Sequence, residues 1–60
     1  MTLDKHIIQS RRHALGLTQE QLARKAGITS TTIGKYERGE SKPTGLYIKA
    51  LKTALEITEE

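Results

Sequence analysis

The chain has 60 residues, no Cys and a net charge of +3, and residues 1–55 carry all ten Lys and Arg against only four acidic residues. A domain of this size has a core too small for a deep substrate cleft, and without Cys it offers no disulfide, thiolate metal site or thiol nucleophile, so a binding module is favoured over an enzyme. The basic body predicts an anionic partner, nucleic acid ahead of a membrane surface, although a basic surface also serves plain solubility.

The N-terminal run up to Gly16 predicts a helix. Its first ten residues, "MTLDKHIIQS", lack the uninterrupted apolar stretch of a signal peptide or a membrane span, so we expect a cytoplasmic protein. Helical period places five apolar residues on one face, and Gly16 supplies the left-handed position at which many helices end. The five are Leu3, Ile7, Ile8, Ala14 and Leu15. Arg12 falls on the same face, where a partly buried guanidinium needs an acceptor.

A second helix is predicted from the run "LTQEQLARKAG". Thr18 can cap its first turn while Gln21, three residues on, reaches back to complete a capping box. Leu17 and Leu22 fit the hydrophobic staple that accompanies such a box. The apolar stripe is narrow and mostly of small residues, which suits close approach of another helix. It consists of Leu22, Ala23 and Ala26.

A short turn at Gly27 then leads, through the good cap Thr29, into a third helix that starts near Ser30. Helix, Gly-containing turn and helix form the helix-turn-helix arrangement, in which Ala23 must be small because the next helix crosses above it and Gly27 must reach positive φ. A generic helical hairpin is the alternative. Seven positions fit the arrangement: Leu22, Ala23, Ala26, Gly27, Ile28, Ile33 and Tyr36.

The segment "SRRHALGLTQEQLARKAGITSTTIGKYERGESKP" resembles the Cro and phage-repressor (XRE-type) helix-turn-helix family, and the resemblance covers residues 6–57 with the motif at 18–38. It implies an all-α, lambda repressor-like bundle of four to five short helices in a single domain, residues 1–60. It also implies that the second motif helix, about residues 30–38, lies in the major groove of double-stranded DNA.

The resemblance implies that Ser30, Thr31 and Lys35 face base edges. Hydroxyl groups can donate to or accept from several bases, and a Lys can reach the acceptors of guanine. Capping of the first helical turn is the alternative use of the hydroxyls. Gly34 is expected on the same exposed side, where it either lets backbone and DNA approach closely or is simply tolerated at a cost of about 1 kcal/mol relative to Ala.

Phosphate contacts are expected at the start of the second helix, where Thr18 and Gln19 lie beside free N–H groups and the positive end of the helix dipole. The resemblance makes Gln19 a phosphate ligand and adds Thr32, Arg38 and Lys42 around the recognition helix. Arg11 is a weaker candidate. Three further cations are taken as ordinary solvated charges: Lys25, Lys49 and Lys52.

Glu37 lies four residues after Ile33 and therefore turns toward the first helix rather than the groove. The family pairs this position with that of Arg12, and such a partly buried ion pair can be bidentate and fix the angle between the two helices. The alternative, in which Glu37 reads cytosine, would leave Arg12 without a partner.

The fourth run, "TGLYIKALKTALEI", has an apolar face but departs from the resemblance at Gly45, Lys49 and Lys52. Thr58 could cap the start of a fifth helix. A monomer, a homodimer and a fragment of a longer protein are all compatible with this end of the sequence. The residues of the apolar face are Tyr47, Ile48, Leu51, Ala54 and Leu55.

No catalytic site, cofactor or metal is expected. His6 and His13 lie two helical turns apart, too far to share a metal without a third ligand, and no small-molecule substrate is indicated. The sequence therefore predicts a bacterial or phage transcriptional regulator that binds DNA sequence-specifically. The alternative is an antitoxin or adaptor that uses the same fold to hold a protein.

Overall fold

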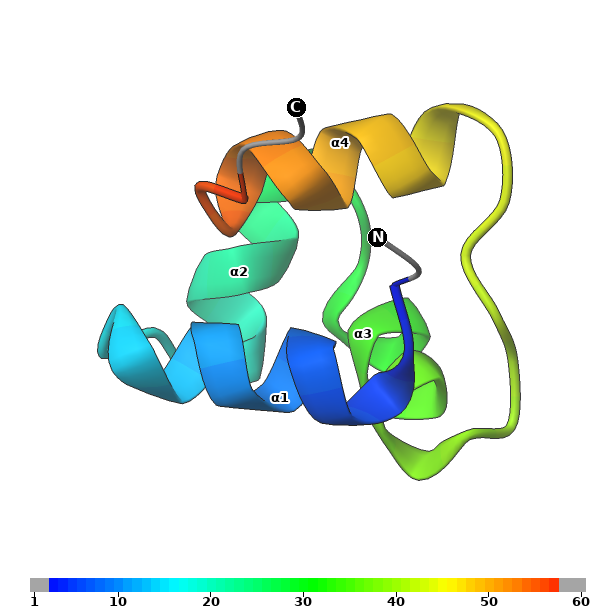
Figure 1. Ribbon diagram of the computed structural model, residues 1–60, viewed down its shortest axis with the longest axis horizontal. Coiled ribbons are helices and arrows are strands. Elements are labelled where there is room, and N and C mark those ends of the chain that lie inside the picture. Colours follow the sequence, from blue (N-terminus) through cyan, green and yellow to red (C-terminus); the bar gives the residue numbers. More distant parts are fainter. Residues whose placement is uncertain (1–2, 58–60) are drawn as a thin grey trace.

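Four α-helices make up the fold in the computed structural model, which describes residues 3–57. They are α1 (Lys5–Ala14), α2 (Gln19–Ala26), α3 (Ser30–Arg38) and α4 (Leu46–Ala54). Figure 1 shows α1 and α4 at opposite edges of the molecule, α2 standing between them and α3 viewed end-on beside α1. The predicted all-α bundle is confirmed, whereas the fifth helix expected at Thr58 lies outside the described residues.

The first three helices begin at side-chain caps. Asp4 Oδ1 accepts the N–H of Ile7 at 2.9 Å, and Thr29 Oγ1 accepts the N–H of Thr32 at 3.2 Å. The predicted capping box of α2 is present, with Thr18 Oγ1 accepting the N–H of Gln21 at 3.0 Å and Gln21 Oε1 accepting the N–H of Thr18 at 2.8 Å. Since each bond satisfies a backbone group that the helix itself cannot, these starts are fixed by local sequence.

The turn between α2 and α3 is short because Gly27 adopts a left-handed conformation, with φ of 73°. This conformation allows the N–H of Ile28 to donate to the carbonyl of Ala23 at 2.8 Å, which closes the end of α2. Thr29 then caps α3. The chain thus reverses within three residues and brings α3 against α2, as the helix-turn-helix prediction requires.

The core forms where α3 packs against α1 and α2, and where α2 packs against α4. All nine residues of this core are nearly or fully buried, which anchors the bihelical unit of α2 and α3 on the other two helices. They are Leu3, Ile8, Leu22, Ala23, Ile33, Tyr36, Leu51, Ala54 and Leu55. No helix in the described range is both long enough and apolar enough to cross a membrane.

Two residues assigned to apolar faces are exposed instead. Ala14 is exposed because it ends α1 at the edge away from α3, as Figure 1 shows. Tyr47 is 51% exposed and its neighbour Leu46 is 84% exposed. Both lie in the first turn of α4, which extends beyond α2, so the helix is buried mainly through its second half.

Candidate nucleic-acid interface

The first turns of α3 present an open polar face. Ser30, Thr31 and Lys35 are all exposed. Within the described part of the chain, none of their side chains takes part in a hydrogen bond or an ion pair. Their hydroxyl and ammonium groups are therefore available to an external partner.

Thr32 follows Thr31 in the first turn of α3 and is half-buried. Its hydroxyl oxygen is 2.8 Å from that of Thr29, so one of the two groups donates to the other. One hydroxyl hydrogen of the pair is left over and can donate outward.

The N-terminus of α2 forms a second part of the surface. Thr18 Oγ1 accepts from the backbone, which leaves its own hydroxyl hydrogen free to donate. The backbone N–H groups of Gln19 and Glu20 donate no hydrogen bond to any residue of the range 3–57. These groups lie at the positive end of the helix dipole, an arrangement that favours an anion.

Gly34 is buried, and its expected place on the exposed side is wrong. A Cβ at this position would lie 3.1 Å from Arg38 Nη1 and 3.7 Å from Gln19 Oε1. Two long side chains, one from α2 and one from α3, therefore close over the glycine and bury it. The same geometry brings Gln19 and Arg38, both expected to hold phosphates, onto one patch of surface.

Arg12 and Glu37 form a bidentate ion pair between α1 and α3. Arg12 Nε donates to Glu37 Oε2 at 2.6 Å and Nη2 donates to Oε1 at 3.0 Å. The side chains are only 11% and 4% exposed. Arg12 Nη1 also donates to the carbonyl of Leu17 at 2.9 Å, and Gln19 Nε2 donates to Glu37 Oε1 at 3.2 Å. One carboxylate thus joins α1, α2 and α3.

The surroundings of Glu37 lower the pKa of its carboxyl group. Burial acts in the opposite direction and raises it, but the hydrogen bonds from Arg12 and Gln19 and the positive charge of Arg12 outweigh burial. Glu37 is therefore ionised at neutral pH. It also faces the first helix rather than the exposed side of α3, which leaves Arg12 with the acceptor that it needs.

Arg38, the residue after Glu37 and the last of α3, is paired with Glu40. Its Nε donates to Glu40 Oε2 at 2.5 Å and its Nη2 donates to Oε1 at 3.4 Å, with the side chains 57% and 54% exposed. The hydrogen bond from Arg38 and its positive charge lower the pKa of Glu40, with a smaller contribution from the charge of Lys35. Sequence analysis missed Glu40, whose only signal is its place two residues after Arg38.

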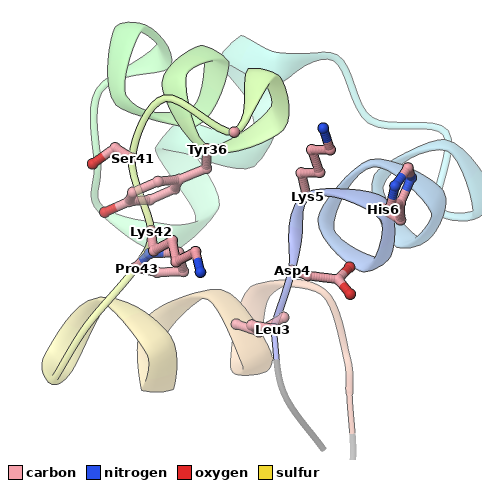
Figure 2. A pocket seen from close by; sticks show the side chains of 9 residues that line it. Leu3, Asp4, Lys5, His6, Tyr36, Ser41, Lys42 and Pro43 are labelled. Carbon is pink, nitrogen blue, oxygen red and sulfur yellow. The ribbon is translucent and has the colours of Figure 1, made fainter.

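Lys42 lies on the segment between α3 and α4, beside a hollow of about 300 Å³. Figure 2 shows its side chain directed across this hollow toward the N-terminal segment, with Tyr36 and Pro43 on its own side. Lys42 is exposed, and within residues 3–57 it has no ion pair. Its ammonium group is therefore available to an external partner beside this hollow.

Two other cations have partners elsewhere. Arg11, the weaker phosphate candidate, donates through Nη2 and Nε to the carbonyl of Leu55 at 3.1 and 3.3 Å and so closes the end of α4. Lys25, taken as an ordinary solvated charge, forms an ion pair with Glu56, in which Nζ lies 3.2 Å from Oε2. Both contacts join residues far apart in the sequence, so local spacing gave no signal for them.

The helix-turn-helix family model matches residues 7–60 of the chain. The transcriptional repressor RstR of the cryptic phage CTXphi, from Vibrio cholerae serotype O1, is 39% identical over 54 residues, which are 90% of this chain and 48% of RstR. An uncharacterised helix-turn-helix-type transcriptional regulator of Methanothermobacter thermautotrophicus is 39% identical over 49 residues, 82% of this chain and 71% of that protein. The chain thus spans about half the length of RstR.

Solved structures of the P22 c2 repressor share the fold. Its DNA-binding domain in solution aligns with a TM-score of 0.87 and 30% identity, covering 97% of this chain and 78% of that one. A crystal structure of that repressor with a synthetic operator aligns with a TM-score of 0.88 and 31% identity, covering 97% and 88%. The chain belongs to the helix-turn-helix family, and the resemblance to its phage-repressor type is confirmed.

Proposed function

We propose that this protein is a sequence-specific DNA-binding transcriptional regulator that places α3 in the major groove. The observation that carries the proposal is the open face of α3, where three polar side chains have no hydrogen bond or ion pair to any residue of the range 3–57, next to the anion-favouring start of α2. The likeness to a repressor crystallised with a synthetic operator supports DNA binding by this fold. In helix-turn-helix proteins the second helix of the motif lies in the major groove.

Base reading is assigned to Ser30, Thr31 and Lys35. The two hydroxyls lie in the first turn of α3, the part of a recognition helix that reaches base edges. Each can donate or accept, and the methyl group of Thr31 can contact thymine. Lys35, one turn later on the same face, can reach the acceptors of guanine.

Phosphate binding is assigned to five residues that surround this face. Their contacts would fix the register of α3 without carrying sequence information. They are Thr18, Gln19, Thr32, Arg38 and Lys42. Gln19 has a second role, because its amide also donates to Glu37 and ties the phosphate surface to the buried ion pair.

Binding itself would be the regulatory act, since a domain bound at a promoter controls the access of polymerase. The first test measures affinity for a random duplex over a series of salt concentrations. Affinity should fall steeply as salt rises, because each phosphate neutralised by a cation releases a counterion from DNA. A chain that binds no duplex at low salt would refute the proposal.

A second test separates base contacts, which set the sequence preference, from phosphate contacts, which do not. It uses three matched lysine variants. Lys35→Ala should lose roughly 1 to 3 kcal/mol on the preferred sequence and relax the preference at one or two base pairs. Lys42→Ala removes the same charge from a phosphate position, so it should weaken all duplexes by similar factors. Lys49→Ala, at an exposed position of α4, serves as the control.

The preferred sequence would come from selection of bound sites in a random pool, followed by competition binding of each variant. If Lys42→Ala reordered the sites while Lys35→Ala preserved their order, the orientation proposed for α3 would be wrong.

A protein-interaction module is the second candidate function. The exposed Leu46 and Tyr47 favour it, because large apolar side chains exposed on a small surface often mark a contact with another protein. A module of this kind requires no counterion release, so the salt series on random DNA distinguishes the two functions.

A further inference from the structure

Glu40 is held at the end of α3 by the backbone. Gly39 adopts a left-handed conformation with φ of 78°, and the N–H of Glu40 donates to the carbonyl of Lys35 at 2.9 Å. This helix ending fixes where the side chain of Glu40 starts. Its carboxylate then reaches back to the guanidinium of Arg38 with both oxygens, at 2.5 and 3.4 Å.

The pair between Arg38 and Glu40 does little for the fold. A negative charge at the C-terminus of a helix has the unfavourable sign, because the carbonyl end of the helix dipole is itself negative. Both side chains are more than half exposed, and exposed ion pairs contribute little to stability. A role outside the fold is therefore the better explanation for the place of this carboxylate.

The carboxylate occupies the part of Arg38 that a phosphate would use. A guanidinium binds carboxylates and phosphates through the same planar fork of N–H donors. Arg38 lies over Gly34 beside Gln19, on the patch to which phosphate binding is assigned. A phosphate that approaches this patch must displace Glu40 from Nε and Nη2 or bind beside a negative charge.

We propose that Glu40 is an internal competitor for the phosphate site of Arg38, which lowers the affinity of the protein for every duplex by the same factor and leaves its sequence preference unchanged. The inference rests on the proposed function, because it concerns how tightly the same surface binds DNA. Glu40 acts through Arg38 and is a positioning residue rather than a contact to DNA.

The test is a double-mutant cycle on DNA affinity with Glu40→Gln, Arg38→Gln and the double variant. Glu40→Gln keeps the shape of the side chain and removes its charge, and it should tighten binding by about threefold to fivefold at low salt, the range expected for loss of one exposed ion pair. The gain should shrink at high salt because screening weakens the competing pair. In the Arg38→Gln background the same change should have little effect.

Glu56→Gln is the matched control. Glu56 is also exposed and also paired with a cation, Lys25, at 3.2 Å, but it lies at the end of α4. This control should leave DNA affinity within about 1.5-fold, as expected for a charge outside the contact surface. Thermal unfolding of all variants should stay near that of the wild type, which separates the effect from a change in folding.

The outcomes are distinct. Equal tightening by Glu40→Gln in both backgrounds would show general charge repulsion and overturn the inference, as would no tightening in a wild-type protein that binds DNA. A reordering of preferred sites by Glu40→Gln would also overturn it. If no variant bound any duplex, the proposed function would fail, and the inference would fail with it.

Discussion

The C-terminal turn of α3 carries the same chemical pair twice, in opposite surroundings. Toward the interior, Glu37 meets Arg12 with side chains that are 4% and 11% exposed. Three residues later, Glu40 meets Arg38 with side chains that are 54% and 57% exposed. Both pairs use two carboxylate oxygens and two guanidinium nitrogens. The difference between them is access to water.

This difference separates the architecture of the domain from its proposed interface. In the buried pair each charge depends on its partner, because water cannot replace the lost contact. In the exposed pair water or a phosphate can replace the carboxylate at little cost. The buried region therefore sets the angle between helices, while the exposed end of α3 is open to exchange with a ligand.

Removal of one buried partner should have the largest effect. Arg12→Ala or Glu37→Ala alone should lower the free energy of unfolding by about 3 kcal/mol, because each leaves an uncompensated charge in the interior. Urea unfolding followed by helical circular dichroism measures the loss. Arg38→Ala, which removes a partner of the exposed pair in the same turn of α3, is the control and should leave stability close to that of the wild type.

The double variant of Arg12 and Glu37 shows whether the two residues act as a pair. The loss in the double variant should be clearly smaller than the sum of the two single losses, since no charge is left unpaired. If the losses simply added, the contact would not hold α1 and α3 together.

A larger side chain in the buried region should give the next largest loss of stability. Ala23 is 3% exposed on α2, the helix against which α3 packs. Ala23→Leu should overpack this interior by roughly 1 to 3 kcal/mol and impair DNA binding through altered helix geometry. Unfolding and duplex affinity measure the two effects. Unchanged stability together with unchanged affinity would mean that the helices do not cross at Ala23.

Acid should weaken the buried pair more than the exposed one. The pKa of Glu37 in the folded protein lies below its ordinary value of 4.5. Its contribution to stability is therefore fully present above that value and is lost as pH falls through the lower, folded-state pKa. The stability gap between the wild type and Glu37→Gln should thus narrow in acid, as unfolding at a series of pH values would measure.

Glu40→Gln supplies the comparison, since the pKa of Glu40 is also lowered but its carboxylate is exposed. Its stability gap to the wild type should be smaller at every pH. A gap for Glu37→Gln that stayed constant into strong acid would show that the buried carboxylate titrates alike in the folded and unfolded chain.

Sequence pattern was sufficient where the cause is local. The capping box of Thr18 and Gln21 and the left-handed Gly27 follow from short spacings, and the structure contains both. The inward turn of Glu37 follows from helical period, and an Arg on an apolar face signals that a carboxylate is needed.

Features that depend on long side chains or on helix placement could not be predicted. The burial of Gly34 results from side chains that belong to two helices. The exposure of Tyr47 depends on how far α4 extends past α2. The hydrophobic periodicity of a single helix does not predict this placement. The bonds from Arg11 to Leu55 join residues 44 positions apart. Glu40 contacts Arg38, which lies only two residues earlier, so this contact is local. The exposure of the pair, which indicates a role in binding, depends on the folded structure.

Gly34→Ala should give the smallest effect and should move stability and binding in opposite directions. Ala in the interior of a helix is favoured over Gly by up to about 1 kcal/mol. The new Cβ would lie 3.1 Å from Arg38 Nη1, which is the far end of a flexible and largely exposed side chain, so the guanidinium can move aside. Unfolding should therefore show a small gain in stability.

Arg38 would leave its place beside Gln19, so affinity for random and preferred duplexes should fall by a similar small factor with the order of sites intact. A variant with lower stability would show that Arg38 cannot move, and a variant with unchanged affinity would remove the patch around Gly34 from the proposed phosphate surface.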